Sequence, residues 1–466
     1  MAGRKLKLNP LDASWLMVES VETPMHVGSL TIFSLPKGAP DTFLKDLVAH
    51  LRAQNHYAPP FNLKLASAAL KGVLPAWIED HKIDLEYHFR HSALPLPGGE
   101  RELGVLISRL HSHQLDFNRP LWECHIIEGL EHNRFAMYMK MHHSQIDGVG
   151  GMRMLQKMMS TNPDVTEQPA PWSVGRGGGG PKPQRDRSPL SERLMKLARG
   201  QAETLPGVAR ALGEVVKESW SKSNADNAMP YAAPRSVLNT KIGGQRRFAT
   251  QFYELERIKK IAKATDVTVN DVFLELCAGS LRKYLEEIQA LPDSPLTAGV
   301  PVSVRPADDA DSGNAISFII ANLNTHIGDP LKRLQAIKQS TTIAKEKLQA
   351  LPKAGISSYT MIFMAPYILQ LLTGLGGRTR PMFNVTISNV PGPQEPLYFN
   401  GARLEQMYPI SLLSHGQALN ITVVSYSGQF NVGFTGCRDT LPHMQRLATY
   451  MAEDLEELEK ALKKKK

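Results

Sequence analysis

The sequence predicts an α/β or α+β protein of two domains, each of which contains both strands and helices. Three observations support this prediction. The chain has 466 residues, more than a single domain usually holds. Strand-like and helix-like patterns are mixed in both halves of the chain. Between the halves, residues 167–189 are rich in Gly, Pro and charge and have almost no periodic apolar pattern, which is typical of a linker.

These observations divide the chain into three parts. We expect an N-terminal domain over residues 1–172 and a C-terminal domain over residues 235–466. Residues 173–234 are expected to form the interdomain linker, with a crossing helix over residues 190–221. The run of four glycines in this linker is not a phosphate-binding loop, because no strand precedes it and no Gly-Lys-Ser/Thr follows it.

The N-terminal half contains one clear helix and three clear strands. Residues 27–33 are rich in strand-forming side chains. Residues 41–55 place apolar side chains at helical spacing behind a polar cap. Residues 121–130 and 134–143 read as neighbouring strands, joined by the short stretch "EHN" as a hairpin.

The C-terminal half has strong patterns of both kinds. Residues 267–289 predict a helix whose first turn carries a capping box made by Thr268 and Asp271. Strands are expected over residues 296–304, over 314–327 and, as a hairpin turning at Ser427-Gly428, over 418–437. A last helix is predicted from an apolar stripe made by Met444, Leu447, Met451, Leu455, Leu458 and Leu462.

Charge and cysteine content restrict the partners and the compartment. The net charge of +9 favours an anionic partner, either a phosphorylated ligand or an anionic membrane surface. Nucleic acid is not expected, because the chain has no zinc finger, RNP-type run or basic-aromatic stripe. Its three cysteines, Cys124, Cys277 and Cys437, are far apart and odd in number, which predicts free thiols in a reducing, cytoplasmic setting.

The sequence does not predict a membrane-spanning protein. The N-terminal stretch "MAGRKLKLNPLDASW" lacks the apolar run of a signal peptide. Residues 359–377 form the longest apolar stretch, but Pro366 and Gln370 interrupt it before it reaches the roughly 20 residues that cross a bilayer. Two interpretations remain: a pair of buried helices, or a surface that touches lipid or lines an acyl pocket.

Two adjacent histidines stand where a predicted strand gives way to a loop. In "YMKMHHSQIDGVGG" (138–151), strand alternation sends His142 and His143 to opposite faces. His143 then shares a face with the apolar residues, whereas His142 follows Tyr138 and Lys140. Functional side chains often lie at such positions, because the strand fixes them and the loop leaves room for a ligand.

Three roles are open for the pair: metal ligands, packed structural side chains, or a general base. A metal would require more convergent ligands, and the strong His-Glu-x-x-His pattern is absent. A neutral imidazole near pH 7 can remove a proton from an alcohol, amine or thiol, and partial burial helps to keep it neutral. We therefore favour a general base and expect no metal.

The residues around the pair resemble a known group of enzymes. His-His-x-x-x-Asp-Gly is the signature of the CoA-dependent acyltransferase superfamily, which includes chloramphenicol acetyltransferase and peptide-synthetase condensation domains. Four further stretches resemble the bacterial wax ester synthase/acyl-CoA:diacylglycerol acyltransferase family, in order along the chain. They are "NPLDASWLMVESVETPMHVGSLTIF" (9–33), "RPLWECHIIEGL" (119–130), "TVNDVFLELCAGSLRKYL" (268–285) and "NVTISNVPGP" (384–393).

This resemblance implies a fold and a reaction. It implies two chloramphenicol-acetyltransferase-like α/β domains, each with a mixed sheet, an active-site channel between them, and a segment of the second half that completes the first sheet. It also implies transfer of a long-chain acyl group from acyl-CoA to a fatty alcohol or diacylglycerol, with no cofactor, metal or acyl-enzyme. The expected location is cytoplasmic, peripheral at the inner membrane or at lipid inclusions.

The resemblance also assigns roles within the His-His motif. His143 falls on the general base, and His142 on a supporting residue. Asp147 is expected to be structural and to pair with an arginine, for which Arg305 is a candidate by residue type alone. Gly148 is expected to let the backbone turn tightly.

The remaining candidates lie outside that motif. Asn270 and Asp271 match a pair linked to activity in the family. Both also suit the start of a helix, so a capping role competes with a role for Asn270 as an oxyanion donor. "SNVPGP" is expected to form a turn beside the channel, with polar contacts from Ser388 and Asn389. A bracing role in the core or pocket wall is expected for Pro120, Leu121 and Trp122.

Other functions remain compatible with the sequence. One is a CoA-dependent acyltransferase with another polar acceptor. A second is a non-catalytic lipid-binding protein with a vestigial site, against which the intact motif argues. A third is a metal-dependent hydrolase. The sequence does not rank alcohol against diacylglycerol as acceptor, because that choice depends on pocket dimensions.

Overall fold

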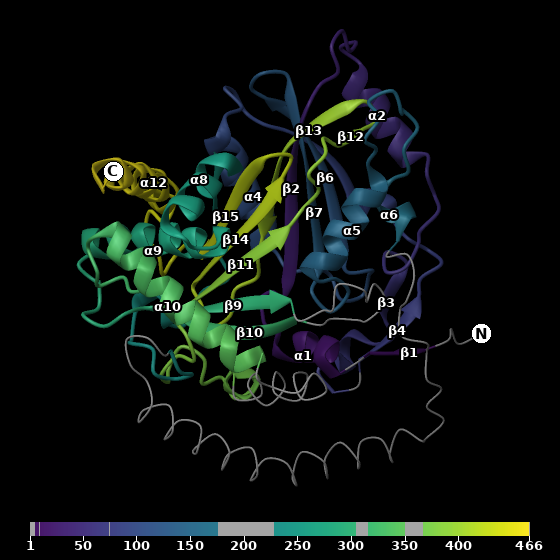
Figure 1. Ribbon diagram of the computed structural model, residues 1–466. Coiled ribbons are helices and arrows are strands. Elements are labelled where there is room, and N and C mark those ends of the chain that lie inside the picture. The colour runs from purple at the N-terminus through teal and green to yellow at the C-terminus, as the bar shows by residue number, and fades with distance from the viewer. Residues whose placement is uncertain are drawn as a thin grey trace.

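Two six-stranded sheets dominate the structure. The computed structural model describes residues 5–8, 10–73, 75–175, 228–303, 316–349 and 367–465. Within these residues, the purple and blue N-terminal half builds most of one sheet and the teal to yellow C-terminal half builds the other, with helices packed around both (Figure 1). Each sheet contains parallel and antiparallel neighbours. The predicted α/β architecture with two mixed sheets is therefore confirmed.

The N-terminal sheet has the strand order β12-β13-β2-β7-β6-β5. Its strands are β2 (His26–Ser34), β5 (Phe89–Ala93), β6 (Trp122–Leu130), β7 (Arg134–His142), β12 (Tyr398–Phe399) and β13 (Ala402–Ile410). The expected β6-β7 hairpin is present and turns at His132 and Asn133, whose φ angles are 64° and 53°. β13 comes from the second half and pairs with β2, so the segment that was expected to complete the first sheet does so.

Helices cover both faces of this sheet. On one face α2 (Phe43–Arg52), α5 (Gly148–Met158) and α6 (Pro171–Val174) pack against the apolar side chains of β7. On the other face lies α4 (Glu100–Ser112), which contacts Ala136 and Tyr138 of the same strand through Leu103 and Ile107. The strand alternation therefore sorts the side chains of β7 as the sequence predicted. The short helix α3 (Leu85–His88) leads into β5.

The C-terminal sheet has the order β10-β9-β11-β14-β15-β8. Its strands are β8 (Arg246–Glu254), β9 (Thr297–Ser303), β10 (Ile316–Asn322), β11 (Val385–Pro391), β14 (Leu419–Tyr426) and β15 (Gln429–Cys437). The predicted hairpin joins β14 to β15, with Ser427 and Gly428 at φ 43° and 78°. Such positive φ values suit a tight hairpin turn.

Four helices form the outer layer of the C-terminal half, on the left of Figure 1. They are α8 (Leu255–Thr265), α9 (Val269–Glu287), α10 (Pro330–Gln349) and α12 (Arg446–Lys465). α9 packs against the other three, and its nearly continuous burial explains why its pattern was easy to read. The apolar stripe predicted for the last helix lies in the same core, although Met444 precedes the first residue of α12.

A small unit beside the N-terminal sheet was not predicted. It contains a three-stranded sheet of β1 (Leu6–Lys7), β4 (Ala76–Glu79) and β3 (Leu63–Leu65), together with α1 (Pro10–Val18) and the 3₁₀ turn η1 (Ala68–Leu70). Leu16 of α1 is buried there against Leu65, Trp77 and Leu121. A second 3₁₀ turn, η2 (Val237–Asn239), precedes β8.

The two halves are joined by α4. β8 is the edge strand of the C-terminal sheet, and α4 lies along it. The backbone N–H of Arg246 donates to Ser112 Oγ at 2.8 Å, and that of Phe248 donates to Ser108 Oγ at 2.9 Å. Two serines one helical turn apart therefore satisfy donors that the edge of a sheet would otherwise expose.

The predicted domain limits do not coincide with the two sheets, because strands of the C-terminal half belong to the N-terminal sheet. Trp172, at the expected end of the N-terminal domain, is buried against Trp122, whereas β12 and β13 return from the C-terminal half. The expected crossing helix 190–221 lies outside the described residues, as do residues 359–366 of the apolar stretch. None of the described helices is both long enough and apolar enough to cross a membrane.

Candidate active site

The two histidines have different surroundings. His142 is the last residue of β7 and is fully buried, whereas His143 starts the following turn and is half-buried. Backbone hydrogen bonds fix both: His142 N–H donates to Leu121 O at 3.0 Å, and His143 N–H donates to Met25 O at 2.8 Å. The two rings therefore have different surroundings, but β7 ends at His142, so the expected place of His143 on the apolar face of the strand stays a prediction.

The imidazole of His142 is held from both ends. Its Nδ1 accepts from the backbone N–H of Ser144 at 3.1 Å and lies 2.6 Å from Ser144 Oγ. Because a backbone N–H can only donate, Nδ1 is the unprotonated nitrogen and the ring proton is on Nε2. That Nε2–H points at Glu19 Oε2, 2.5 Å away, inside a site that excludes solvent from both side chains. The hydrogen bonds therefore fix one neutral tautomer.

The imidazole of His143 lies against the indole of Trp15. The ring centroids are 4.5 Å apart and the planes are inclined by 29°, a stacked arrangement. Trp15 belongs to α1, which is bound at its C-terminal end by Lys71, whose Nζ donates to the carbonyls of Leu16 and Glu19 at 3.3 Å. α1 thus forms one wall of the site.

Asp147 and Gly148 begin α5. Asp147 is the N-cap, and its Oδ1 accepts from Gly150 N–H at 2.6 Å. This agrees with a structural aspartate, and an N-cap carboxylate is favourable at a helix N-terminus. Within the described residues Asp147 has no ion pair with an arginine, and Arg305 lies outside them. The pairing stays a prediction.

The role expected for Gly148 needs correction. It does not form a tight turn: it is the first residue of α5 and its φ is not positive. The helix starts at Gly148 because the Asp147 cap compensates for the weak helix propensity of the glycines. A Cβ on Gly148 would lie 3.6 Å from Val390 Cγ2, an ordinary van der Waals distance, so the start of α5 lies next to β11.

"SNVPGP" also differs from the expectation. Ser388 and Asn389 lie within β11, which continues to Pro391, and not in a turn. β11 stays paired with β14 from Thr386 to Pro391, but its pairing with β9 ends at Thr386. A strand tolerates Pro391 at its end, where no further ladder bond is needed. Ser388 and Asn389 are half-buried beside the start of α5.

Asn270 and Asp271 lie in the helical layer of the C-terminal half. Asp271 Oδ2 accepts from Thr268 N–H at 3.0 Å, and its Oδ1 accepts from the Thr341 hydroxyl at 2.7 Å. The predicted capping box is confirmed, and Asp271 links α9 to α10. Asn270 is half-buried at the same terminus, and among the described residues no hydrogen bond, ion pair or ring contact joins it to His143.

The Pro-Leu-Trp stretch is part of the core. Pro120, Leu121 and Trp122 are buried, and Leu121 O is the acceptor for His142 N–H. The Trp122 ring stacks on His88, with centroids 4.4 Å apart, and its Nε1–H donates to Phe61 O at 2.9 Å. This placement agrees with the expected bracing role.

Behind His142, the same face of the sheet carries buried ionisable groups. Lys140 Nζ donates to Glu123 Oε2 at 3.0 Å and to two carbonyls at the C-terminal end of α4. Burial opposes the charge of Glu123, but the hydrogen bond from His125 and the charge of Lys140 outweigh it and lower the pKa of Glu123 to about 2. Burial, with the charge of Lys140, lowers the pKa of His111 to about 3 and also lowers the pKa of His26.

Metal ligation and cysteine chemistry find little support in the described residues. Among them, no three His, Cys, Asp or Glu side chains converge as a metal site would require. Burial raises the pKa of the Cys124 thiol to about 12, and it also raises the pKa of Cys277. A buried thiol of this kind is a poor nucleophile.

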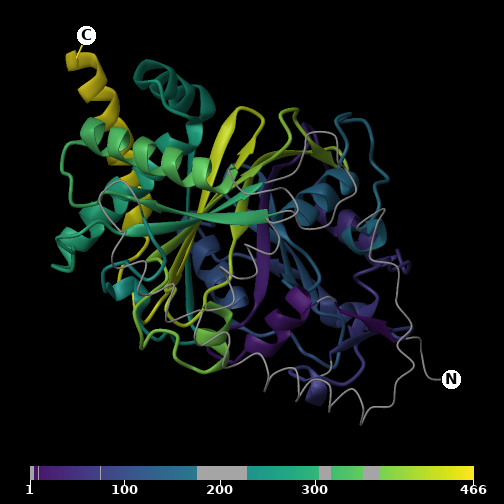
Figure 2. The same cartoon turned by 60° about the horizontal axis from the view of Figure 1, so that its bottom comes forward.

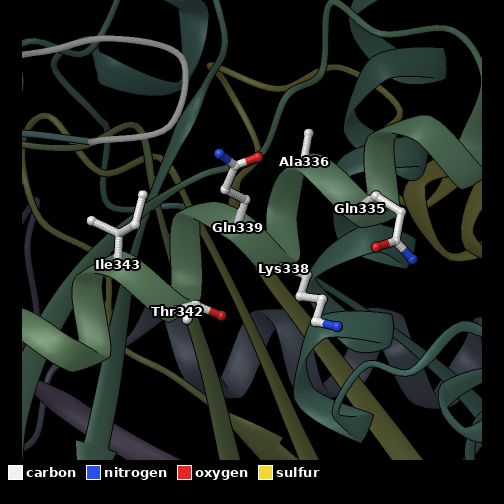
Figure 3. A pocket seen from close by; sticks show the side chains of 6 residues that line it. All are labelled: Gln335, Ala336, Lys338, Gln339, Thr342 and Ile343. Carbon is white, nitrogen blue, oxygen red and sulfur yellow. The ribbon is translucent and has the colours of Figure 1, made fainter.

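A shallow hollow of about 520 Å³ lies on the outer face of α10 (Figure 3). Its lining residues are Gln335, Ala336, Lys338, Gln339, Thr342 and Ile343. All six belong to one helix of the C-terminal half, and none belongs to the segments that surround His143. We therefore do not assign the chemistry to this hollow.

The sequence analysis missed Glu19, Trp15 and Ser144 as members of the site. Glu19 lies 123 positions before the histidine it contacts, and no spacing rule connects the two. The available signal was the family-like stretch 9–33, which contains both Glu19 and Trp15 next to the strand that pairs with β7. Ser144 lies in the turn after β7, and the small residues of that turn were interpreted only as turn-forming.

Known proteins of one family resemble this chain over most of its length. The wax ester synthase/diacylglycerol acyltransferase catalytic domain matches residues 8–273, and the C-terminal domain of the same family matches residues 312–459. The O-acyltransferase WSD of Acinetobacter baylyi is 43% identical over 98% of both chains. A probable diacylglycerol O-acyltransferase of Mycobacterium tuberculosis is 42% identical over 97% of this chain and 98% of its own.

Solved structures give the same result. The wax ester synthase/diacylglycerol acyltransferase of Marinobacter aquaeolei VT8 matches with a TM-score of 0.80 and 39% identity, over 98% of this chain and all of that one. The starter condensation domain of rhizomide synthetase, solved with C8-CoA, shares the fold at a TM-score of 0.55 and 14% identity, over 98% of this chain and 94% of that one. The chain therefore belongs to the wax ester synthase/diacylglycerol acyltransferase family.

Proposed function

We propose that this protein is an O-acyltransferase that moves a long-chain acyl group from acyl-CoA to the hydroxyl of a fatty alcohol or of diacylglycerol. The observation that carries the proposal is the unequal setting of the two histidines. His142 is buried and locked as a neutral tautomer, whereas His143 is half-buried in the turn after β7, against Trp15 of α1. Family membership supplies the substrate class.

The proposed chemistry needs one proton carrier. His143 takes the proton from the acceptor hydroxyl as its oxygen attacks the thioester carbonyl of acyl-CoA. The new C–O bond gives a tetrahedral intermediate with a negative oxygen. When the C–S bond breaks, the electron pair leaves on sulfur, and His143 returns its proton to the CoA thiolate. The products are the ester and free CoA, without a metal or an acyl-enzyme.

Supporting roles follow from the placement of the other residues. His142, Glu19 and Ser144 position the turn that carries His143, and Asp147 with Gly148 sets the start of α5 against β11. We propose Asn270 as an oxyanion donor on the basis of the family motif, while its neighbour Asp271 is a structural cap. Ser388 and Asn389 are proposed as polar contacts along the channel.

We further propose that one face of the protein rests on an anionic lipid surface. This lipid-facing surface comprises three exposed apolar side chains and two exposed basic ones: Val21, Leu372, Leu375, Lys241 and Arg378. Val21 is 75% exposed, and it lies two residues after Glu19. Exposed apolar side chains bordered by basic ones suit an anionic lipid surface.

Contacts across the two halves hold this surface together. His415 Nε2 lies 3.2 Å from Glu22 Oε2, which links the second half to the segment of Val21. Gly376 and Gly377 approach His415 and the backbone of Lys241 so closely that a Cβ on either would lie within 2.8 Å of a backbone atom. The turned view brings α1 and the helical residues 367–372 to the front beside each other (Figure 2).

The lipid proposal is tested by co-sedimentation with phosphatidylglycerol vesicles. The double substitution Leu372→Asp/Leu375→Asp should reduce binding at least severalfold. Leu96→Asp, at a leucine that is 93% exposed in the loop between β5 and α4, serves as the matched control and should bind normally. Equal binding by both variants would remove this surface from consideration.

The activity is tested with palmitoyl-CoA and hexadecanol or dipalmitoylglycerol, following free thiol and ester mass together. Equal amounts of thiol and ester are expected, and the ratio of the two acceptors gives the preference. His143→Ala should lose most activity, whereas the exposed His81→Ala should retain it. Thiol release without ester would indicate hydrolysis, and loss of ester on adding a chelator would indicate a metal.

A further inference from the structure

The stacked pair of Trp15 and His143 joins two segments that are distant in the sequence. The indole comes from α1 and the imidazole from the turn after β7, and their centroids are 4.5 Å apart with the planes inclined by 29°. An imidazole in this position presents one face to the aromatic ring. The ring edge, which carries both nitrogens, is left for other partners.

Both rings belong to segments that other contacts hold in place. α1 is anchored by Leu16, which is fully buried against Trp77 and Leu121, and by the two hydrogen bonds of Lys71 to its C-terminal carbonyls. The backbone of His143 is held by its 2.8 Å hydrogen bond to Met25 O. The stacking therefore joins two segments whose positions are each fixed by other contacts.

We propose that Trp15 is a positioning residue whose indole face stabilises the imidazolium form of His143 during acyl transfer. This inference rests on the proposed function, in which His143 carries the proton of the acceptor hydroxyl. A cation over an indole face within about 6 Å of its centroid is attracted by the ring quadrupole, whereas a neutral imidazole gains much less. The contact therefore strengthens as the proton arrives, which is the condition for lowering a barrier.

The charges around the pair belong to several elements and are unaffected by a change at Trp15. Among the described residues on α1, β2, η1, β7 and the start of α5, together with Glu19 and Lys71 that directly follow α1 and η1, the titratable groups are Asp12, Glu19, His26, Lys71, Arg134, Tyr138, Lys140, His142 and Asp147. Glu19 is bound to His142, and Asp147 is bound to the first turn of α5. A change in the titration of His143 on replacing Trp15 would therefore report the loss of the indole face.

The first test is the pH dependence of kcat/KM with palmitoyl-CoA and hexadecanol. Trp15→Leu should move the acid limb to lower pH by about 0.5 to 1 unit and lower the plateau by about three- to tenfold, because the imidazolium loses its cation–π contact. Trp15→Phe should fall between wild type and Trp15→Leu. An acid limb that stays in place in Trp15→Leu would overturn the proposal.

Trp77→Leu is the matched control. Trp77 packs in the same cluster as Leu16 of α1, so this variant loosens the packing of α1 without removing the ring next to His143. It should lower thermal stability and leave the acid limb unchanged. If Trp77→Leu moves the acid limb as far as Trp15→Leu does, general loosening of α1 explains the effect and the proposal fails.

The second test does not depend on turnover. The pKa of His143 is read from the ¹³Cε1 resonance of labelled histidine, assigned by its absence in His143→Ala. The wild-type value should exceed that of Trp15→Leu by about 0.5 to 1 unit. This difference in pKa would be seen even in a protein that formed no ester. A failure of the proposed acyl transfer is therefore distinguishable from a failure of the proposed role of Trp15. Equal values in both proteins would refute the role of Trp15.

Discussion

Glu19 fixes the tautomer of His142: its Oε2 lies 2.5 Å from Nε2, while the Ser144 backbone N–H occupies Nδ1. The other carboxylate oxygen of Glu19 accepts from Gln114 Nε2 at 3.0 Å, just beyond the end of α4. α4 in turn satisfies the edge of β8 through Ser108 and Ser112. A continuous set of hydrogen bonds thus connects the joint between the two halves with the turn that carries His143.

The first prediction concerns Glu19. Glu19→Ala leaves the buried Nε2–H of His142 without an acceptor, which costs about 1–3 kcal/mol of stability and should lower kcat/KM by about ten- to a hundredfold. Glu19→Gln keeps a carbonyl oxygen at the same place and should retain more activity than Glu19→Ala. Kinetics and thermal unfolding of both variants check this. Equal losses in the two would mean that the charge of Glu19, and not its hydrogen bond, is what matters.

The elements that the sequence predicted are those with long and regular patterns. α9 was readable because almost every side chain is buried and its first turn carries a capping box. The strands β1, β3 and β4 were missed because segments of two to four residues carry too little periodicity. α1 has nine residues, but its apolar side chains show little helical periodicity. "SNVPGP" was read as a turn from its composition, but pairing with β14 keeps β11 extended to Pro391.

The site was predictable only in part, for a similar reason. The expectation of different surroundings for His142 and His143 came from the two-residue period of a strand, a local rule, although β7 ends at His142. The partners of the two rings come from α1, which carries Trp15, and from Glu19 just after its end. Only the tertiary fold brings them to the end of β7, so no local rule could have identified them.

The second prediction separates the two residues of the Asn-Asp motif. Asp271→Ala removes the capping box and the Thr341 hydrogen bond, and should lower stability by about 1–3 kcal/mol. Asn270→Ala should leave stability nearly unchanged and lower kcat with little change in KM if its amide reaches the developing oxyanion. Thermal unfolding and steady-state kinetics distinguish the two. A purely thermal effect of Asn270→Ala would remove it from the chemistry.

The third prediction concerns stability in acid. Burial lowers the pKa of His111 to about 3, so the folded protein keeps this ring neutral while the unfolded chain binds a proton below about 6.5. The melting temperature of the wild type should therefore fall as the pH drops from 7 to 5. His111→Gln should be less stable at pH 7, because it loses the contact with Tyr138, but its decline towards pH 5 should be shallower. The exposed His113→Gln should follow the wild type.

The fourth prediction concerns a buried charge cluster in the C-terminal half. Glu275 Oε1 and Asp454 Oδ1 accept from the same Arg333 Nη2, at 2.7 and 2.8 Å, and all three side chains are buried. Burial raises the pKa of Glu275, the charge of Asp454 raises it further, and Arg333 opposes both. One guanidinium therefore faces two carboxyl groups, and a proton on Glu275 relieves the excess negative charge.

The sign of the resulting pH dependence follows from that raised pKa. Below about pH 4.3 the folded and unfolded chains both hold the proton, so Glu275 contributes no pH dependence there. Above that pH the unfolded chain loses the proton and the folded chain keeps it, so stability falls as the pH rises towards the folded pKa. Glu275→Gln carries no titratable proton, while its carbonyl still accepts from Arg333 and its amide can donate to Asp454. Its melting temperature should exceed that of the wild type at pH 8 by about 1 °C per kcal/mol gained, and the advantage should disappear near pH 4. An advantage of equal size at both pH values would show that Glu275 is ionised in the folded protein throughout.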